Sequence, residues 1–210
     1  MQVLLDKIQH ELTVGLPGRP AQFEMTNIKR QLDDVTPENA RKAGVMLLLY
    51  PDVKQKIHVI FMVRTSKNPN DPHSGQVSFP GGKLEDTDES LLACALRETE
   101  EEIGISLSDI LVLGKLTPLY IPISNFDVYP FVGFLAKNPS FVLQESEVKS
   151  IIQLPIEHFL SPSQKGKTDI TVHQFTMTNV PYFNANGTKI WGATSMILNE
   201  FLTVWQKINP

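Results

Sequence analysis

Two apolar runs in the first third of the chain constrain its fold most. Residues 44–50 read GVMLLLY, and residues 57–65 read IHVIFMVRT. Both runs are short, rich in aliphatic and aromatic residues, and bounded by polar segments, which is typical of buried β-strands. The polar residues between them, PDVKQK, predict a hairpin connection. A sheet is therefore expected to begin here.

The order of the other elements predicts one sheet covered by a few helices. Apolar residues at helical spacing predict an opening helix at 2–13, a central helix at about 90–103 and a closing helix at about 191–207. Further elements are expected after the central helix: strands at 109–120, 126–136 and 148–154, a short helix at 155–160, and a hairpin at 168–190 with NANG as its turn. Strands and helices do not alternate regularly. The sequence therefore predicts an α/β (α+β) fold with a mixed β-sheet sandwiched between α-helices.

Length and composition predict a single domain over residues 1–210. Its N-terminal helix is followed by an irregular, proline-containing arm that extends to about residue 42. A net charge of −4 argues against a nucleic-acid backbone as the partner, because such proteins usually carry a basic surplus. The one cysteine, Cys94, is expected to be a small buried side chain.

The sequence also favours the cytoplasm over a membrane or export. No apolar run approaches the ~20 residues that a bilayer-spanning helix needs. The N-terminus carries acidic residues and lacks the apolar core of a signal peptide. A homo-oligomer is compatible with all of these features.

The central helix contains the acidic segment RETEEEIG, residues 97–104. Glu98, Glu101 and Glu102 lie three and four residues apart, so their carboxylates are expected to crowd one helix face. A hard divalent cation such as Mg²⁺ would offset this repulsion, and Arg97 can orient one carboxylate. A run of glutamates alone would favour an exposed acidic surface. The loop FPGG before the helix favours a metal site instead, because glycine lets a backbone carbonyl approach a cation closely.

Gly82, the acidic residues at 85–89 and RETEEEIGI at 97–105 together resemble the Nudix box. Relative to the consensus of that family, Glu89 is correctly spaced from Arg97, but Gly82 lies one residue further upstream. Either Asp88 or Glu89 is therefore the expected partner of Arg97.

Residues 73–82, HSGQVSFPGG, resemble the extended signature of the coenzyme A pyrophosphatase branch of the Nudix family. Weaker similarity extends from about residue 16 to residue 205. The resemblance implies metal-dependent hydrolysis of the pyrophosphate bond of coenzyme A or its derivatives. The products would be 4′-phosphopantetheine and adenosine 3′,5′-bisphosphate, and the cofactor would be Mg²⁺ or Mn²⁺.

The resemblance also implies roles for individual residues. The metal site would comprise Glu98, Glu101, Glu102 and a carbonyl in the Gly81–Gly82 turn, here assigned to Gly82. Glu98 would be either a ligand or the base that activates water. The catalytic set would comprise Glu98, Glu101, Arg97 and an acid outside the box, for which the candidate is Glu147 and the rival is Glu145.

Substrate-binding candidates lie before the box. Arg64, Lys67 and Lys83 are the nearest cations for a 3′-phosphate, although each is also compatible with a plain surface charge. His73 and Gln76 would either recognise the substrate or brace the loop by hydrogen bonds. Phe126 is expected to pack in the core rather than to stack on adenine.

Two other functions compete with hydrolysis of coenzyme A. The first is a pyrophosphatase that acts on another nucleoside diphosphate derivative, such as ADP-ribose, a dinucleotide or a nucleoside triphosphate. The second is a non-catalytic nucleotide-binding module that shares the fold. The three crowded carboxylates argue against the second function, because a binding module does not require them.

Overall fold

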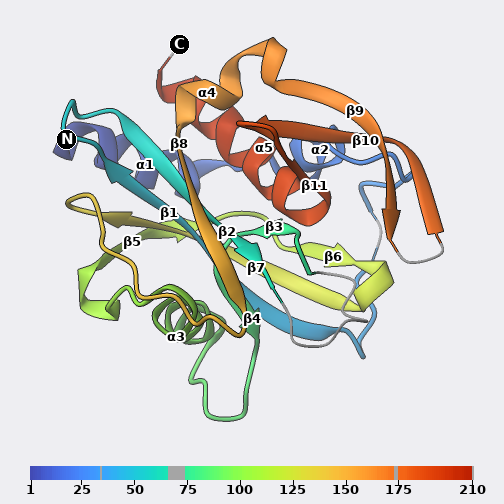
Figure 1. Ribbon diagram of the computed structural model, residues 1–210, viewed down its shortest axis with the longest axis horizontal. Helices are drawn as coiled ribbons and strands as arrows, with labels where there is room; N and C mark the ends of the chain where they lie inside the picture. Colours follow the sequence, from blue (N-terminus) through green and yellow to red (C-terminus); the bar gives the residue numbers. More distant parts are fainter. Residues whose placement is uncertain (34, 66–73, 173–174, 210) are drawn as a thin grey trace.

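The protein is described by a computed structural model that covers residues 1–33, 35–65, 74–172 and 175–209. Its centre is a sheet with the strand order β3-β2-β1-β7-β5, in which β4 also pairs with β1, β6 with β7 and β8 with β2 (Figure 1). The strands are β1 (Arg41–Pro51), β2 (Ile57–Arg64), β3 (Val77–Ser78), β4 (Gly81–Lys83), β5 (Ile110–Lys115), β6 (Leu119–Ile121), β7 (Phe126–Leu135) and β8 (Val148–Pro155). β1 pairs in parallel with β7 and antiparallel with β2, so the sheet is mixed, as predicted.

Helices cover both faces of this sheet (Figure 1). They are α1 (Gln2–Val14), α2 (Gly18–Phe23), α3 (Leu91–Ile103), α4 (Ile156–Leu160) and α5 (Gly192–Ile208), with single turns of 3-10 helix at Leu107–Asp109, Pro122–Ser124 and Pro162–Gln164. Among the described residues, no helix is long and apolar enough to span a membrane.

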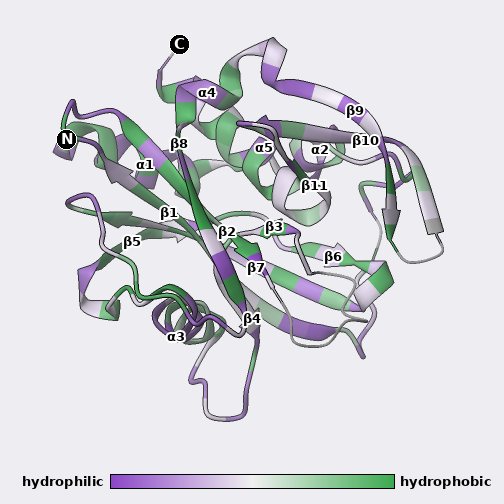
Figure 2. Cartoon of the chain, viewed as in Figure 1, coloured by the Kyte–Doolittle hydropathy of each residue, from purple (hydrophilic) through white to green (hydrophobic). Residues whose placement is uncertain are grey.

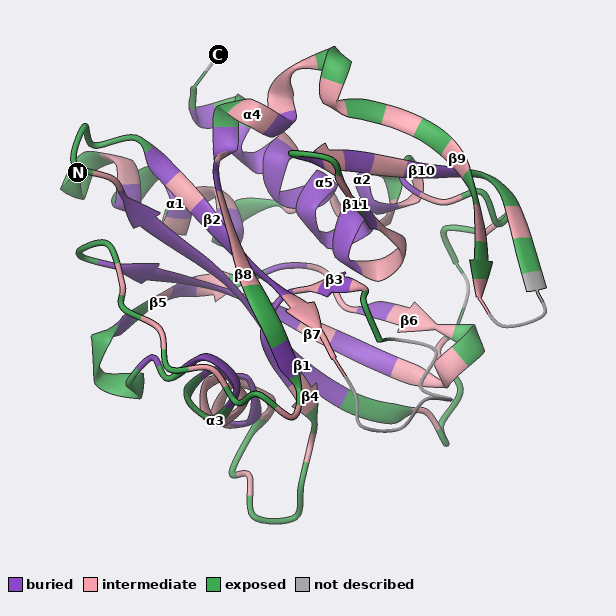
Figure 3. Cartoon of the chain, viewed as in Figure 1, coloured by how far each residue is buried: buried purple, intermediate pink, exposed green. Residues whose placement is uncertain are grey.

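The alternation of side chains along β1 divides the apolar core in two. Leu47 and Leu49 point into the larger core, which they share with α1, α4 and α5. Met46 and Leu48 point into a smaller core against α3. Figure 2 shows the hydrophobic colouring of the central strands, and Figure 3 shows that α5 is largely buried. The sequence prediction of a sheet between helices is confirmed.

A second, smaller sheet packs beside α5 (Figure 1). Its order is β11-β10-β9, with β9 at Lys165–Val172, β10 at Phe175–Ala185 and β11 at Thr188–Trp191. The predicted turn joins β10 to β11, and both Asn186 (φ 52°) and Gly187 (φ 93°) adopt the left-handed conformation that this kind of hairpin uses. The single hairpin predicted for 168–190 is thus a three-stranded sheet.

Two further sequence predictions need correction. The arm at 15–42 is not wholly irregular, because it contains α2 and the start of β1 at Arg41. A helix of this length is too short to give a periodic apolar signal. The single strand predicted at 109–120 is broken after Lys115, and the chain resumes as β6 at Leu119. The break includes Pro118, which has no N–H for a sheet ladder.

Candidate active site

The acidic helix α3 begins and ends on local signals. The Ser90 Oγ accepts a hydrogen bond from the Ala93 N–H at 3.1 Å, which caps the first turn. Gly104 ends the helix in the left-handed conformation (φ 71°), and its N–H donates to the Glu100 carbonyl. These caps fix the helical frame from which the glutamates project.

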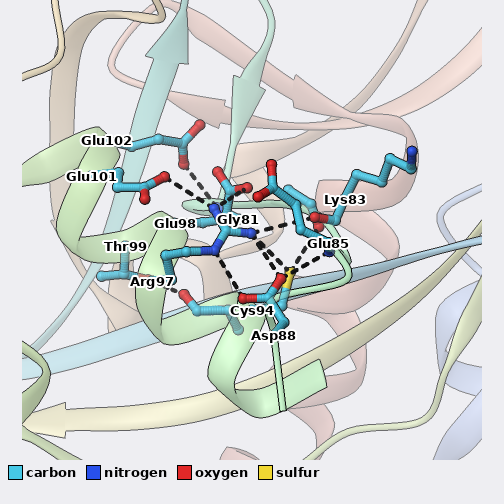
Figure 4. A network of polar contacts seen from close by, with 12 residues as sticks. Gly81, Lys83, Glu85, Asp88, Cys94, Arg97, Glu98, Thr99, Glu101 and Glu102 are labelled. Carbon is cyan, nitrogen blue, oxygen red and sulfur yellow. Dashed lines mark hydrogen bonds and ion pairs between the residues drawn. The ribbon is translucent and has the colours of Figure 1, made fainter. Parts of the chain in front are cut away.

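Arg97 is the centre of a network of carboxylates (Figure 4). Its Nε and Nη2 donate to the two oxygens of Asp88 at 2.8 and 2.9 Å. The bidentate partner left open by the sequence is therefore Asp88. This hydrogen bonding lowers the pKa of Asp88 to about 2. Nη1 donates to Glu98 and to Glu101, each at 3.0 Å, so one guanidinium orients three carboxylates.

Glu102 is buried beside the glycine turn, with 2% of its surface exposed. One carboxylate oxygen accepts the Gly81 N–H at 2.8 Å, and the other lies 3.7 Å from Arg64 Nη1. Burial outweighs both contacts and raises the Glu102 pKa to about 8. The pKa of Glu98 is also raised by burial, against the opposing effect of Arg97. The negative charge of Glu147 raises both pKa values further, so the three groups share one electrostatic site.

Strand pairing brings Glu147 to this site. β8 pairs with β2 up to Arg64, where the register shifts. The Thr65 N–H then donates to the Glu147 carbonyl at 2.8 Å. The Arg64 N–H donates to the Gln76 carbonyl at 2.8 Å on the other side of the same strand end. Residues far apart in sequence therefore gather where β2 ends.

Close packing leaves no room for a side chain at Gly81 or Gly82. A Cβ atom at Gly82 would overlap the carboxylate of Glu98, and one at Gly81 would overlap the backbone of β1. The Gly82 carbonyl accepts the thiol of Cys94 at 3.4 Å. Cys94 is buried, as predicted, and burial raises the pKa of its thiol to about 11.

A cavity of about 780 Å³ opens beside the turn. Its polar end is lined by most of the residues singled out from the sequence: Arg64, Gln76, Gly82, Lys83, Glu98, Glu102 and Glu147. Glu101 is exposed and paired with Arg97, so only two of the three box glutamates face the cavity. Within the described ranges, no three acidic, histidine or cysteine side chains are already arranged as metal ligands. His73 and Lys67 lie outside the described residues.

The far end of the cavity was missed by the sequence reasoning. Phe126 packs against the main core, as expected, but it also lines the cavity. The Arg41 guanidinium lies 4.0 Å from the centre of its ring. Trp191, at the end of β11, and Thr194, in the first turn of α5, also line it. The Thr194 hydroxyl donates to the Val77 carbonyl at 2.9 Å. The sequence signals for this region were the weak family similarities of residues 126–134 and 190–201.

Comparison with known protein families agrees with this geometry. The model of the NUDIX domain matches residues 40–171, which include the glycine turn, α3 and Glu147. The chain belongs to the Nudix family. Two solved structures share the fold. The Nudix hydrolase RenU of M. smegmatis has a TM-score of 0.53 and 13% identity, with 80% of this chain and 88% of that chain covered. The MutT protein of Methanosarcina mazei Go1 has a TM-score of 0.50 and 16% identity, with 81% and 99% covered.

Curated Nudix relatives match this chain in sequence. "Uncharacterized Nudix hydrolase NudL" of Yersinia pestis (strain Pestoides F) is 39% identical over 129 residues, as is its namesake in Yersinia pseudotuberculosis serotype IB (strain PB1/+). The match covers 61% of this chain and 63% of each relative. Most of the arm and all of β10, β11 and α5 lie outside the NUDIX match.

Proposed function

We propose that this Nudix protein is a metal-dependent diphosphatase that hydrolyses the pyrophosphate bond of coenzyme A or its derivatives. The products would be 4′-phosphopantetheine and adenosine 3′,5′-bisphosphate. The observation that carries the proposal is the buried Glu102 carboxylate, which lies beside Glu98 and the Gly81–Gly82 turn at the polar end of a large cavity.

The residues at this end fit a divalent cation. Burial and the neighbouring carboxylates make a negative charge on Glu102 unfavourable, and a bound cation would offset that cost. Mg²⁺ and Mn²⁺ prefer carboxylate and carbonyl oxygens. Glu98, Glu102 and the Gly82 carbonyl would hold the ion, and Glu101 would join them after release from Arg97. When bound, the cation would stabilise negative charge that develops on the diphosphate oxygens.

The protein side chains would bind the substrate and move the proton. Arg64 and Lys83 line the polar end, where they would bind phosphate oxygens. A water molecule would attack one phosphorus atom, and the bond from that atom to the bridging oxygen would break. The proton of the water would pass to a carboxylate, either Glu98 or Glu147. Arg97 would act as a positioning residue, because it holds Glu98 without lining the cavity itself.

Two observations support coenzyme A as the substrate class. The signature at 73–82 is typical of the coenzyme A branch, and its residues from Gln76 to Phe79 line the cavity with the glycine turn. The cavity volume also lies within the range of small-molecule sites, near its upper end.

A substrate panel tests this proposal. The purified protein is incubated with Mg²⁺ or Mn²⁺ and with coenzyme A, ADP-ribose, a dinucleoside polyphosphate or a nucleoside triphosphate, and the products are identified by mass. We expect coenzyme A to be cut into the two phosphomonoesters. A strong preference for ADP-ribose would overturn the substrate assignment, and cleavage of none of the diphosphates would overturn the enzyme.

A further inference from the structure

The outer strand of the small sheet, β9, has one open edge (Figure 1). It is eight residues long, and among the described residues it pairs with β10 alone. Exposed and half-buried residues alternate along it, so neither of its faces is deeply buried (Figure 3). The open edge of a strand is a template for another strand. A further strand can therefore extend the small sheet at β9.

The backbone groups of every second residue of β9 point to the open edge. In an antiparallel pair of strands, hydrogen-bonded and non-hydrogen-bonded positions alternate. Lys167 lies opposite Pro181 of β10, which has no N–H to donate. This pair therefore fits a non-hydrogen-bonded position, and the N–H and C=O of Lys167 point outward. The same alternation turns the backbone groups of Lys165, Asp169 and Thr171 outward.

The side chains on the exposed face of β9 are complementary to a second copy of the same strand. This face consists of Lys165, Lys167, Asp169 and Thr171. When two copies pair antiparallel about a two-fold axis at Thr168, Lys167 of each copy lies opposite Asp169 of the other. A shift of the axis by one residue would place either Lys167 or Asp169 opposite its own copy, which like charges disfavour. A shift by half a residue would pair an exposed face with a half-buried one. The charges and faces therefore select one register.

The half-buried face of β9 fits the same register. Ile170 is half-buried and belongs to neither of the two apolar cores described above. In this register, Ile170 of one copy lies opposite Gly166 of the other. The ring of Tyr182 covers Gly166 so closely that a Cβ atom there would overlap it. The aliphatic side chain would thus lie beside an aromatic ring, which is a favourable pair across strands.

The longer edge strands of the central sheet lack this complementarity. β5 and β8 each carry one charged residue, Lys115 and Lys149 respectively. Neither strand can therefore place opposite charges across from each other when two copies pair. Lysines on an edge strand by themselves oppose the addition of another strand. Asp169 changes this balance in β9, because it offers Lys167 of a second copy a partner of opposite charge.

We infer that β9 is the interface of a homodimer, in which two copies pair β9 with β9 antiparallel about a two-fold axis at Thr168. The two three-stranded sheets then form one continuous six-stranded sheet. About eight backbone hydrogen bonds join the copies, two for each pair of outward-facing residues. The contact is isologous, so it closes at two copies. It also places Gln164 of the second copy opposite Val172, which lines the active-site cavity, so the dimer would support the rim of that site.

Analytical ultracentrifugation of the full chain over a range of concentrations tests the inference without substrate or metal. We expect the wild type to form a reversible dimer. Lys167→Asp and Asp169→Lys each put like charges opposite one another at two places in the dimer. Each variant should therefore raise the dissociation constant at least about tenfold. The double variant restores the opposite charges and should dimerise like the wild type.

A matched control separates this interface from other effects of charge. Lys149→Asp makes the same change at an exposed position of the edge strand β8, and it should leave the dissociation constant within about twofold. The Asp169 carboxylate also accepts the Asn179 N–H at 3.0 Å, and the double variant lacks this hydrogen bond too. Recovery of the dimer by the double variant would therefore report the pairing of charges between copies. A wild type that stays monomeric, or a dimer that Lys167→Asp weakens no more than Lys149→Asp does, would overturn the inference.

A disulfide across the two-fold axis tests the register. Thr168 lies opposite Thr168 of the second copy in a non-hydrogen-bonded pair, with Cα atoms about 4.5 Å apart, which is within reach of a disulfide. Thr168→Cys should therefore form a covalent dimer under mild oxidation. Lys165→Cys should not, because its two copies would lie roughly 20 Å apart. The native Cys94 is buried and its thiol pKa is raised, so its own cross-linking should be slow. Cross-linking of Lys165→Cys in preference to Thr168→Cys would overturn the register.

Neither test depends on hydrolysis of a diphosphate. A dimer with the expected response to charge but with no diphosphatase activity would sink the proposed function alone. Hydrolysis of coenzyme A by a protein that stays monomeric would sink the β9 interface alone.

Discussion

The ion pair between Asp88 and Arg97 gives a quantitative prediction for the variant Asp88→Asn. The substitution preserves the size of the side chain but removes its charge. It also places an amide NH₂ opposite one of the two guanidinium nitrogens that now donate to Asp88. We expect the variant to be less stable and to hold Arg97 less firmly.

The magnitude follows from the pKa of Asp88. The pKa falls from 3.8 to about 2 on folding, and this shift corresponds to at most about 2.5 kcal/mol of stability. The Arg97 side chain is 23% exposed, so solvent screening reduces the expected loss to about 1–2 kcal/mol. Because the folded pKa is the lower one, this stability is present above about pH 4 and is lost as the pH falls through about 2. At pH 3 the difference between wild type and variant should be about half its value at pH 7.

Urea unfolding at pH 7 and pH 3 measures this difference. Glu89→Gln is the matched control, because Glu89 is the neighbouring acid in the same loop and is exposed. We expect the control to change the free energy of unfolding by less than about 0.5 kcal/mol. The assignment of Asp88 would be refuted if Glu89→Gln were the more destabilising variant, or if the effect of Asp88→Asn were the same at both pH values.

Three further predictions follow from the site and its supports. Gly82→Ala should displace the Glu98 carboxylate and lower turnover at least about tenfold. Gly15→Ala should retain activity, because an added Cβ there meets no atom within 4 Å. Equal activities of the two variants would contradict the close packing of Gly82 against Glu98. Glu200→Leu should lower the free energy of unfolding by about 1–3 kcal/mol in urea, because it strands the donors that bond to this buried carboxylate; an unchanged midpoint would contradict that role. Because the pKa of Glu102 is raised to about 8, the affinity for Mg²⁺ measured by calorimetry should rise with pH up to about 8. Binding should release a proton, so the measured enthalpy should differ between buffers. An affinity that does not change with pH would exclude Glu102 as a ligand.

The parts of the site that depend on local sequence could be predicted. Ser90 before α3 and Gly104 after it set the bounds of the helix. The Gly81–Gly82 pair permits a close approach of the backbone. These signals act within a few residues, so they are readable from the chain alone. For the same reason the spacing of the box glutamates located one end of the cavity.

The remaining parts depend on contacts between distant segments. The choice of Asp88 over Glu89 depends on how the loop folds back onto Arg97. The exposed position of Glu101 follows from its own pairing with Arg97, which helical spacing does not reveal. The apolar part of the cavity lining combines residues about 150 positions apart, such as Met25 and Met177, and their separate sequence patterns do not indicate a shared cavity.

The central proposal is that Glu102 helps to hold a divalent cation in a diphosphatase. Its most direct test is the Mg²⁺-dependent turnover of coenzyme A by Glu102→Gln. The matched control is Glu100→Gln, an exposed position on the same helix. The glutamine at 102 retains an acceptor for the Gly81 N–H, so both variants should remain folded by circular dichroism and urea unfolding. We predict that Glu102→Gln loses at least about a hundredfold in kcat while Glu100→Gln stays within about twofold of the wild type. Turnover by folded Glu102→Gln equal to that of the control would contradict the account.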